Sequence, residues 1–548
     1  MNLKSEIKEF FKGDVADDEE SLQKYSHDAS LLEVRPKIVL YPKDVGDIKN
    51  LVKFVGDHKK DDPTLSVTVR SAGTCMSGGP LNNSIILDVT KYISGTLSVF
   101  STYGDEQATV LPGTFYRDFE KKTLEQGVIL PSYTASKQLC AIGGMVGNNS
   151  GGEKTLAYGK TENYIKSQKV IFSDGNEYVV KGLTKNELDA KIDQNDFEGN
   201  IYRKVYELVE RNKELLSEAK PKVSKNSAGY FLWNVWDGKM FDLNRLLVGS
   251  QGTLAITTEV TFKLVPVKKY SKLYVIFLKD LGMISQLVNE ILPFKPESIE
   301  SYDDHTMKLA LKFFPDMAKT MKSNFVKLLW SFLPEAKMIL TGGIPKLIVL
   351  VEFGEDREEE IEKKVRDLDE HLKKFHLKTR ITTSAEESEK YWTIRRESFN
   401  LLRKHVKHRR TAPFIDDIIV RPEFLPEFIP KLTEILNKYK LLYTVAGHVG
   451  DGNFHIIPLM DMHDYKNKKI IMNVSGEVYD LVLKFKGSIT AEHGDGIVRT
   501  PYLKKMFSYE VIKIFEDVKN IFDPQNIFNP GKKVGDTLEY FKDHIVVE

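Results

Sequence analysis

Short apolar runs alternate with polar and amphipathic segments along the first half of the chain. The runs at 38–41, 65–69 and 85–89 have the length and the β-branched content of strands. Between the first two, apolar residues recur at helical spacing from 48 to 55, and Asp44 stands where a helix N-cap is expected. Strands and helices are therefore expected to alternate in this part of the chain.

Three glycine-rich stretches interrupt these elements, at 70–79, 141–152 and 249–257. Such stretches leave backbone N–H groups uncovered and permit positive φ, as a phosphate-bearing ligand lying against the main chain requires. A flexible linker is the alternative interpretation. In the second stretch three apolar residues are interleaved with the glycines, and a strand is expected soon after it at 169–172. This arrangement favours a ligand cradle, and the three stretches together could wrap a large cofactor.

Composition limits the class of protein. A chain of 548 residues is too long for one core and predicts two or three domains. Its net charge of +1 gives no indication of nucleic-acid binding, and the N-terminus lacks the apolar region of a secretory signal. No apolar run is long enough to span a bilayer, so we expect a cytoplasmic protein. The two cysteines cannot supply an all-cysteine iron–sulfur cluster or zinc site within this chain.

The segment 306–340 combines many lysines with Phe, Leu and Met. It could rest on an anionic membrane surface as a peripheral contact. The alternative is a pair of cap-domain helices with a solvated basic face. The lysines concerned are Lys308, Lys312, Lys319, Lys322, Lys327 and Lys337.

Two Gly-Asp-Gly turns stand beside histidines: His448 and His455 flank the first, and Glu492 and His493 precede the second. The first two histidines are seven residues apart, so they would converge only if the chain bends at 450–452. Two imidazoles and a carboxylate suit a divalent metal of the zinc, manganese or iron type with an open position for substrate. His493 could then act as a general base. Histidines that hydrogen-bond their own backbone in tight hairpins are the alternative.

Arginines form a third group of candidates. Arg395 and Arg396 lie on an expected helix, and Arg409 and Arg410 precede an expected strand at 414–420. An arginine fork is the usual partner of a substrate carboxylate, although most arginines are merely solvated.

Taken together, these motifs resemble those of the FAD-linked 2-hydroxy acid dehydrogenases of the vanillyl-alcohol oxidase superfamily. This group includes D-lactate dehydrogenases, the flavin subunit of glycolate oxidase and D-2-hydroxyglutarate dehydrogenase. The resemblance covers roughly residues 25–533. The motifs, in order, are 70–79, 131–136 with 142–152, 249–257, 447–455, 492–496 and 528–531.

The resemblance implies an α+β fold in three parts. Residues 1–265 would form a two-subdomain FAD-binding domain of the vanillyl-alcohol oxidase type. Residues 266–505 would form an α+β cap domain with an antiparallel sheet and the metal site. Residues 506–548 would return to the FAD-binding domain.

It also implies roles for the site residues. His448, His455 and Glu492 would bind the divalent metal. His493 would be the catalytic base, and Arg395 matches the arginine that binds the substrate carboxylate better than its neighbour does.

The implied FAD is expected to be non-covalent. Some branches of the superfamily bond the flavin to a histidine of the first glycine loop, and 70–79 contains no histidine. The cofactor-binding residues that the matching motifs imply are Arg70, Ser71, Ala72, Gly73, Thr74, Cys75, Ser77, Gly78, Pro131, Thr134, Ala135, Ser136, Gly143, Gly144, Gly147, Asn148, Asn149, Ser150, Gly151, Tyr158, Gly252, Ile256 and Asn529.

The implied activity is oxidation of a small D-2-hydroxy acid, similar to lactate or glycolate, to the 2-oxo acid. Hydride would pass to flavin N5, and electrons would leave to a non-nicotinamide acceptor such as a separate iron–sulfur subunit. Activity on D-2-hydroxyglutarate is the alternative. It is weakened because Ile456-Ile457-Pro458 stands where the hydroxyglutarate enzymes carry an asparagine, and because 414–418 lacks the lysine that they use on substrate.

Two hypotheses come from other classes. A metal hydrolase could use the histidine site without flavin, but no Gly-x-Ser-x-Gly motif is present and the glycine stretches would have no purpose. A non-catalytic flavoprotein subunit could instead only scaffold a complex.

Overall fold

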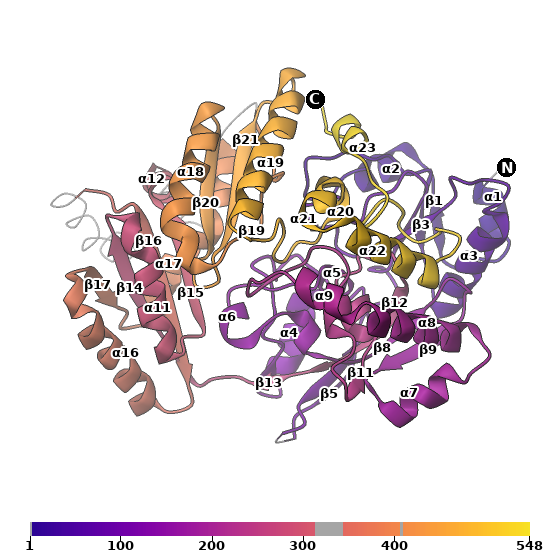
Figure 1. Cartoon of the computed structure of the whole chain (residues 1–548), viewed down its shortest axis with the longest axis horizontal. Helices are drawn as coiled ribbons and strands as arrows, with labels where there is room; N and C mark the ends of the chain where they lie inside the picture. The colour runs from indigo at the N-terminus through magenta and orange to yellow at the C-terminus, as the bar shows by residue number, and fades with distance from the viewer. Residues whose placement is uncertain (1–2, 103, 313–342, 406–408, 548) are drawn as a thin grey trace.

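Residues 3–102, 104–312, 343–405 and 409–547 are described in the computed structural model (Figure 1). The N-terminal segment contains helix α1 (Leu3–Lys8), strand β1 (Asp14–Ala16) and helix α2 (Glu19–Tyr25).

The first sheet has the order β1-β2-β4-β3 and contains the three strands that the sequence predicts. Strands β2, β4 and β3 are parallel, and β1 pairs antiparallel with β2 at the edge. Helix α3 follows β2, and the Asp44 side chain accepts a hydrogen bond from the N–H of Asp47, which confirms the predicted cap. The bounds are β2 (Ile38–Tyr41), α3 (Val45–His58), β3 (Val67–Arg70) and β4 (Ile85–Asp88).

A second, antiparallel sheet has the order β5-β6-β12-β8-β9. Its strands are β5 (Thr96–Phe100), β6 (Gln107–Val110), β8 (Ile165–Ile171), β9 (Glu177–Lys181) and β12 (Ile256–Lys263). Two small strand pairs flank it: β7 (Val128–Ile129) with β13 (Val265–Pro266), and β10 (Leu183–Thr184) with β11 (Met240–Phe241). The helices in this part are α4 (Tyr116–Leu124), α6 (Thr155–Tyr158), α7 (Lys185–Ile192), α8 (Phe197–Arg211), α9 (Lys213–Ala219) and α10 (Asn244–Leu247).

The glycine stretch 141–152 is not the irregular loop that its composition suggests. Helix α5 (Ile142–Asn148) forms inside it, and Asn149 ends the helix in the left-handed conformation with φ 51°. The three apolar residues of the stretch stand at i, i+3 and i+4, so they share one face of the helix and are buried. The glycines of the helix do not belong to this packed face and remain accessible.

The third sheet is antiparallel and has the order β17-β14-β16-β15-β20-β21-β18, with β19 also paired to β21. Only Ile418–Ile419 of the expected strand at 414–420 pair as a strand. The bounds are β14 (Tyr270–Leu278), β15 (Ser298–Asp303), β16 (Leu347–Glu355), β17 (Lys378–Ile381), β18 (Arg410–Thr411), β19 (Ile418–Ile419), β20 (Leu442–His448) and β21 (Asn453–Met460).

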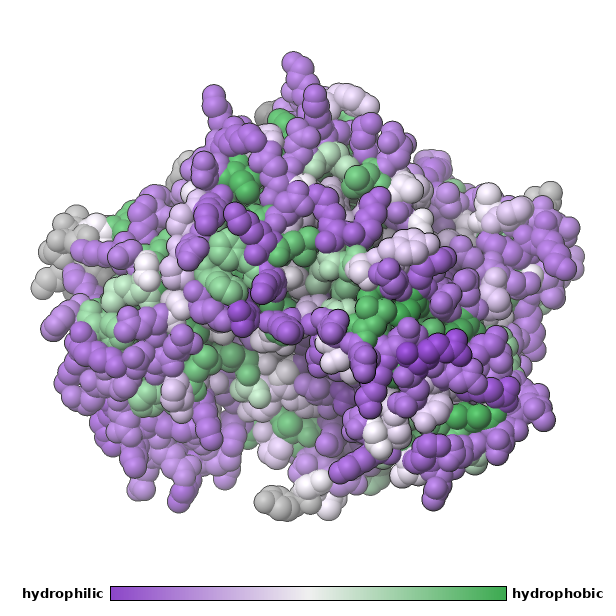
Figure 2. Space-filling model, viewed as in Figure 1, coloured by the Kyte–Doolittle hydropathy of each residue, from purple (hydrophilic) through white to green (hydrophobic). Residues whose placement is uncertain are grey.

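Helices cover both faces of this sheet. One apolar cluster joins the sheet to α11, α16, α18 and α19, and another joins the opposite face to α12 and α17. On the side of the whole molecule that Figure 2 shows, hydrophilic side chains predominate at the surface, and apolar side chains form scattered patches. The bounds are α11 (Ile284–Ile291), α12 (Asp304–Lys312), α16 (Glu358–Leu372), α17 (Ala385–His405), α18 (Leu425–Lys438) and α19 (Lys466–Lys484).

The C-terminal segment returns to the first sheet, as Figure 1 shows. Phe528 forms a parallel bridge with Val67, and Ile545 an antiparallel bridge with Leu32. The helices of this region are α20 (Gly496–Arg499), α21 (Leu503–Met506), α22 (Tyr509–Phe522) and α23 (Leu538–Asp543).

The basic segment at 306–340 falls mostly outside the described residues, because only its beginning lies in α12. Its membrane contact therefore stays a prediction. Within the described ranges, no helix combines the length and the apolar character needed to cross a membrane.

Candidate active site

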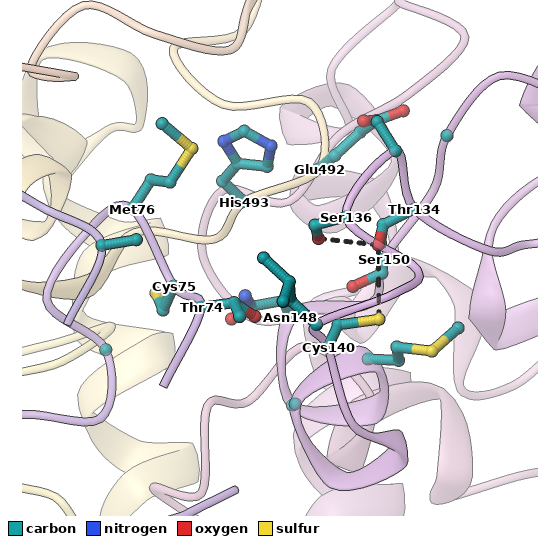
Figure 3. Close-up of a pocket in the computed structure, with 18 of the residues that line it drawn as sticks. Thr74, Cys75, Met76, Thr134, Ser136, Cys140, Asn148, Ser150, Glu492 and His493 are labelled. Atoms are coloured by element: carbon teal, nitrogen blue, oxygen red, sulfur yellow. Dashed lines mark hydrogen bonds between the residues drawn. The ribbon is translucent and has the colours of Figure 1, made fainter. Parts of the chain in front are cut away.

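A cavity of about 920 Å³ is lined by residues from the first glycine loop, the second sheet region and the third sheet. In Figure 3, Thr74, Cys75 and Asn148 lie on one side of the opening, and Glu492 and His493 lie on the other. A volume of this size is in the range of cofactor sites. The predicted cofactor residues that line it are Ser71, Gly73, Thr74, Cys75, Thr134, Ala135, Ser136, Gly143, Gly144, Gly147, Asn148, Ser150, Gly151 and Gly252.

The other predicted cofactor residues do not line the cavity, but one of them supports its walls. Asn529 donates through Nδ2 to the carbonyls of Gly79 and Gln251, and its Oδ1 accepts from Thr68. It thus holds two glycine loops together from behind. The residues outside the lining are Arg70, Ala72, Ser77, Gly78, Pro131, Asn149, Tyr158, Ile256 and Asn529.

The cradle fits a phosphate-bearing cofactor such as FAD. Within the described part of the chain, none of the backbone N–H groups from Ser71 to Met76 donates a hydrogen bond. Such a run of uncommitted donors forms an anion-binding concavity. The cavity-lining segments 131–136 and 141–152 also approach each other closely, since a Cβ on Gly152 would lie 2.1 Å from the carbonyl oxygen of Tyr133. Position 152 therefore requires glycine.

The first Gly-Asp-Gly turn is a hairpin that brings its two histidines together. Strands β20 and β21 pair on either side of it, with Ala446 opposite His455, and the rings of His448 and His455 are 5.3 Å apart. Nε2 of His448 lies 3.5 Å from Oε2 of Glu492, and Nε2 of His455 lies 4.0 Å from the same oxygen. The bend that the sequence requires is thus present, and three donor atoms face a common point.

Carboxylates fix both imidazoles from behind. Nδ1 of His448 contacts Oε1 of Glu300, and Nδ1 of His455 lies 3.1 Å from Oδ1 of Asp416. A carboxylate on Nδ1 leaves Nε2 free for a cation and is the usual second partner of metal-binding histidines. The donor set His448, His455 and Glu492 therefore fits a divalent metal.

A second grouping overlaps this one. Donor atoms of Asp417, His455, Glu492 and His493 all lie within 4.8 Å of one another. However, Oδ2 of Asp417 already accepts hydrogen bonds from the N–H groups of Ala491, Glu492 and His493. Asp417 therefore holds the second turn in shape, and we favour His448 as the third ligand.

His493 lies at the edge of the metal donors. Its Nδ1 is 2.7 Å from Oδ2 of Asp416, and its ring stacks on His455 at 5.2 Å. Burial disfavours the charged imidazole, yet the carboxylates of Asp417 and Asp416 raise the pKa of His493 to about 9. That value applies without a cation, and a divalent cation at Glu492 would favour the neutral ring.

The neighbouring arginines have different partners. Nε of Arg395 donates to Oε2 of Glu300 at 2.8 Å, whereas Arg396 forms a bidentate pair with Glu153. Arg395 is buried, and its Nη2, although 2.8 Å from Glu300, has no hydrogen bond. A guanidinium group that lines the cavity beside the histidines suits a substrate carboxylate. Arg410 lines the same cavity from β18.

The sequence alone did not single out three of these supporting residues. Glu300 lies in β15, and Asp416 and Asp417 precede β19. All three carboxylates are buried. The available signal was an acidic pair enclosed by the apolar residues 414–419, because charges are rarely buried without a partner.

Two family descriptions match the chain. The description "FAD binding domain" matches residues 36–181, and "FAD linked oxidases, C-terminal domain" matches residues 267–533. The first range contains the loop of free N–H groups, and the second contains the histidine hairpin.

Curated relatives match over nearly the whole chain. D-2-hydroxyglutarate dehydrogenase of Haemophilus influenzae is 25% identical over 95% of this chain and 50% of its own length. The glycolate oxidase subunit GlcD of Bacillus subtilis is 25% identical, covering 93% and 91%. D-lactate dehydrogenase of Archaeoglobus fulgidus is 24% identical, covering 91% of each. The chain spans about half the length of the first of these relatives.

Solved structures show the same fold. A 4-ethylphenol oxidase from Gulosibacter chungangensis superposes with a TM-score of 0.70 at 14% identity, covering 98% of each chain. p-Cresol methylhydroxylase gives 0.67 at 15% identity, covering 96% of this chain and 94% of its own. The expected α+β fold of the vanillyl-alcohol oxidase type is thereby confirmed. With its FAD binding domain followed by the C-terminal domain that carries the histidine hairpin, the chain belongs to the FAD-linked oxidases.

Proposed function

We propose that this protein oxidises a small D-2-hydroxy acid to the 2-oxo acid with FAD and passes the electrons to a non-nicotinamide acceptor. One observation carries the proposal: the cavity that contains the FAD cradle also contains the converging atoms of His448, His455 and Glu492. Relatives named for lactate, glycolate and 2-hydroxyglutarate support the substrate class.

The proposed chemistry divides among the groups around the cavity. The divalent metal at His448, His455 and Glu492 would polarise the substrate hydroxyl, and FAD would supply the hydride acceptor. Nε2 of His493 would take the hydroxyl proton, and the carboxylate of Asp416, 2.7 Å from Nδ1, would stabilise the protonated ring.

Substrate orientation would come from the carboxylate. Arg395 would bind it through its guanidinium group, which lines the cavity and stays paired with Glu300. Glu300 also contacts His448. The same buried carboxylate would therefore position both the arginine that binds the substrate and a ligand of the metal. This sharing would place the hydroxyl group close to the metal.

The wall beyond the metal favours a short substrate. Ile457 lies two residues after His455 on the same face of β21, and it lines the cavity with Ala446. An apolar side chain at this position suits a methyl group or hydrogen better than a second carboxylate. Arg410, however, lines the same cavity and favours activity on D-2-hydroxyglutarate as the second candidate.

The electron acceptor is proposed to lie outside these 548 residues. Their two cysteines, Cys75 and Cys140, cannot hold an iron–sulfur cluster, so a separate iron–sulfur subunit is the proposed partner. We also propose the division of the chain into 1–265, 266–505 and 506–548. The hydrolase alternative has no support in the family assignment.

An anaerobic substrate screen tests the proposal. The FAD-loaded protein would be mixed with D-lactate, L-lactate, glycolate and D-2-hydroxyglutarate, and loss of the flavin absorbance would be followed. We expect rapid bleaching by D-lactate or glycolate. Bleaching by D-2-hydroxyglutarate alone would select the second candidate, and bleaching by none would contradict the proposed substrate class.

A further inference from the structure

A buried lysine contacts the carboxylate of the metal donor set through the oxygen that does not face the histidines. Nζ of Lys225 donates to Oε1 of Glu492 at 2.7 Å and lies 3.1 Å from Oδ2 of Asp451. The Lys225 side chain is 1% exposed, and those of Glu492 and Asp451 are 4% exposed. Since the interior shields these charges from water, their geometry is tightly constrained.

The contact decides which oxygen of Glu492 is available. Oε1 is committed to Lys225, whereas Oε2 faces the Nε2 atoms of His448 and His455. Gly151 leaves room for this orientation, because a Cβ there would lie 2.9 Å from Oε1 of Glu492. The carboxylate therefore rests on the FAD glycine stretch and presents one oxygen to the cation.

Lys225 also links the two Gly-Asp-Gly turns. Asp451 belongs to the turn between the histidines, and Glu492 precedes the second turn. The segment that follows Lys225 continues the contact: the N–H of Ser227 donates to the carbonyl of Thr490, and the N–H of Gly229 donates to Asp495. The segment 224–229, between α9 and β11, thus holds both turns in register.

We propose that Lys225 is a positioning residue of the metal site: it occupies Oε1 of Glu492, so that Glu492 binds the cation through Oε2 alone. The proposal rests on the metal centre of the proposed function. Without the ammonium group, Glu492 can rotate or offer both oxygens, and the donor set loses its fixed geometry. Partners behind metal ligands typically contribute about 10–100-fold to metal affinity.

The test compares Lys225→Met with a buried lysine elsewhere. Methionine keeps a similar side-chain length but removes the charge and the donors. Lys519→Met is the matched control, because Lys519 is buried, pairs with Asp523 at 2.6 Å and donates to the carbonyls of Thr253 and Phe528. Both variants lose a buried ion pair, so both are expected to melt at a lower temperature. Only Lys225→Met is expected to lose metal affinity.

The measurement uses Zn²⁺ on the FAD-loaded full chain, in competition with a chromophoric chelator. We expect Lys225→Met to bind Zn²⁺ about 10–100-fold more weakly, with the FAD content unchanged and Lys519→Met at the parent affinity. The visible spectrum of the Co²⁺-loaded protein is expected to change in Lys225→Met only, because it reports the ligand set. Should Lys225→Met not fold, Lys225→Gln replaces it, with the same expectation.

The outcomes separate this proposal from the one on which it rests. If the parent binds no Zn²⁺, both the metal centre and the role of Lys225 are wrong. If the parent binds Zn²⁺ and His448→Ala abolishes binding while Lys225→Met and Lys225→Gln retain it, only the role of Lys225 is wrong. An equal loss in Lys519→Met would show a general effect of destabilisation and would also overturn the proposal.

Discussion

Arg396 and Glu153 form a bidentate ion pair, with Nε–Oε1 and Nη2–Oε2 distances of 2.7 and 2.6 Å. Arg396 lies on α17, against the third sheet, and Glu153 directly follows the second glycine stretch. The pair therefore connects the FAD cradle to the helix that carries the proposed carboxylate-binding Arg395.

The first prediction concerns this pair. Burial opposes the charged form of Glu153, but Arg396 lowers the pKa of its carboxyl to about 2 from the ordinary 4.5. A carboxyl whose pKa falls on folding stabilises the protein above its unfolded pKa, and this contribution disappears as the pH drops toward 2. Arg396→Met should cost up to roughly 3 kcal/mol at pH 7, because it leaves Glu153 buried and unpaired.

Thermal melting from pH 7 to pH 3 checks this prediction. The difference between parent and Arg396→Met should shrink as the pH falls. Arg421→Met is the control, since Arg421 pairs with Glu423 at the surface, where such pairs contribute about 0–1 kcal/mol. A difference that does not change with pH would contradict the assigned role.

A second prediction addresses proton removal. His493→Ala should retain FAD and reduce substrate-dependent flavin bleaching by about 10²–10⁴-fold, the usual contribution of a general base. His463→Ala is the matched control, because His463 is exposed and lies before α19. Stopped-flow bleaching rates decide the matter, and an unchanged rate would remove His493 from the catalytic role.

Metal removal gives a third prediction. Dialysis against a chelator should leave the flavin spectrum in place but abolish bleaching, because the proposed metal ligands are not among the residues from Ser71 to Met76 whose N–H groups are uncommitted. Re-addition of Zn²⁺, Mn²⁺ or Fe²⁺ should restore the rate, and elemental analysis of the untreated protein identifies the resident ion. Full activity in metal-free protein would refute the metal site.

The attachment of FAD provides a fourth prediction. The described loop from Arg70 to Gly79 has no histidine, and burial raises the pKa of the Cys75 thiol, which keeps it protonated and weakly nucleophilic. We therefore expect acid precipitation to release all of the flavin into the supernatant. Flavin that remains in the protein pellet would show a covalent bond.

A fifth prediction uses two glycines. Gly152→Ala should lower FAD retention and destabilise the protein by about 1–3 kcal/mol, because the new methyl group would collide with the carbonyl oxygen of Tyr133. Gly476→Ala is the control: it lies in α19 with open space around it, so alanine should stabilise the helix by about 0.5–1 kcal/mol. Flavin absorbance per protein and melting temperature measure both effects.

Local features of the fold could be predicted from the sequence. Strands β2, β3 and β4 and the Asp44 cap follow from short-range pattern and capping, which depend on neighbouring residues. The composition of the glycine stretch 141–152 indicates a ligand cradle but does not predict a helix there, although its apolar residues at i, i+3 and i+4 form one face of α5. In so short a helix, burial against the second sheet region outweighs the low helix propensity of glycine.

The sequence by itself determined the chemical inventory: the glycine stretches, the histidines of the hairpin, Glu492 and His493, and the order of motifs that marks the family. Only the tertiary structure decided which side chains support them. Lys225 lies 267 residues from Glu492, and Glu300 lies 148 residues from His448. Contacts over such separations leave no local pattern, because they arise when distant segments pack and each buried charge must find a partner.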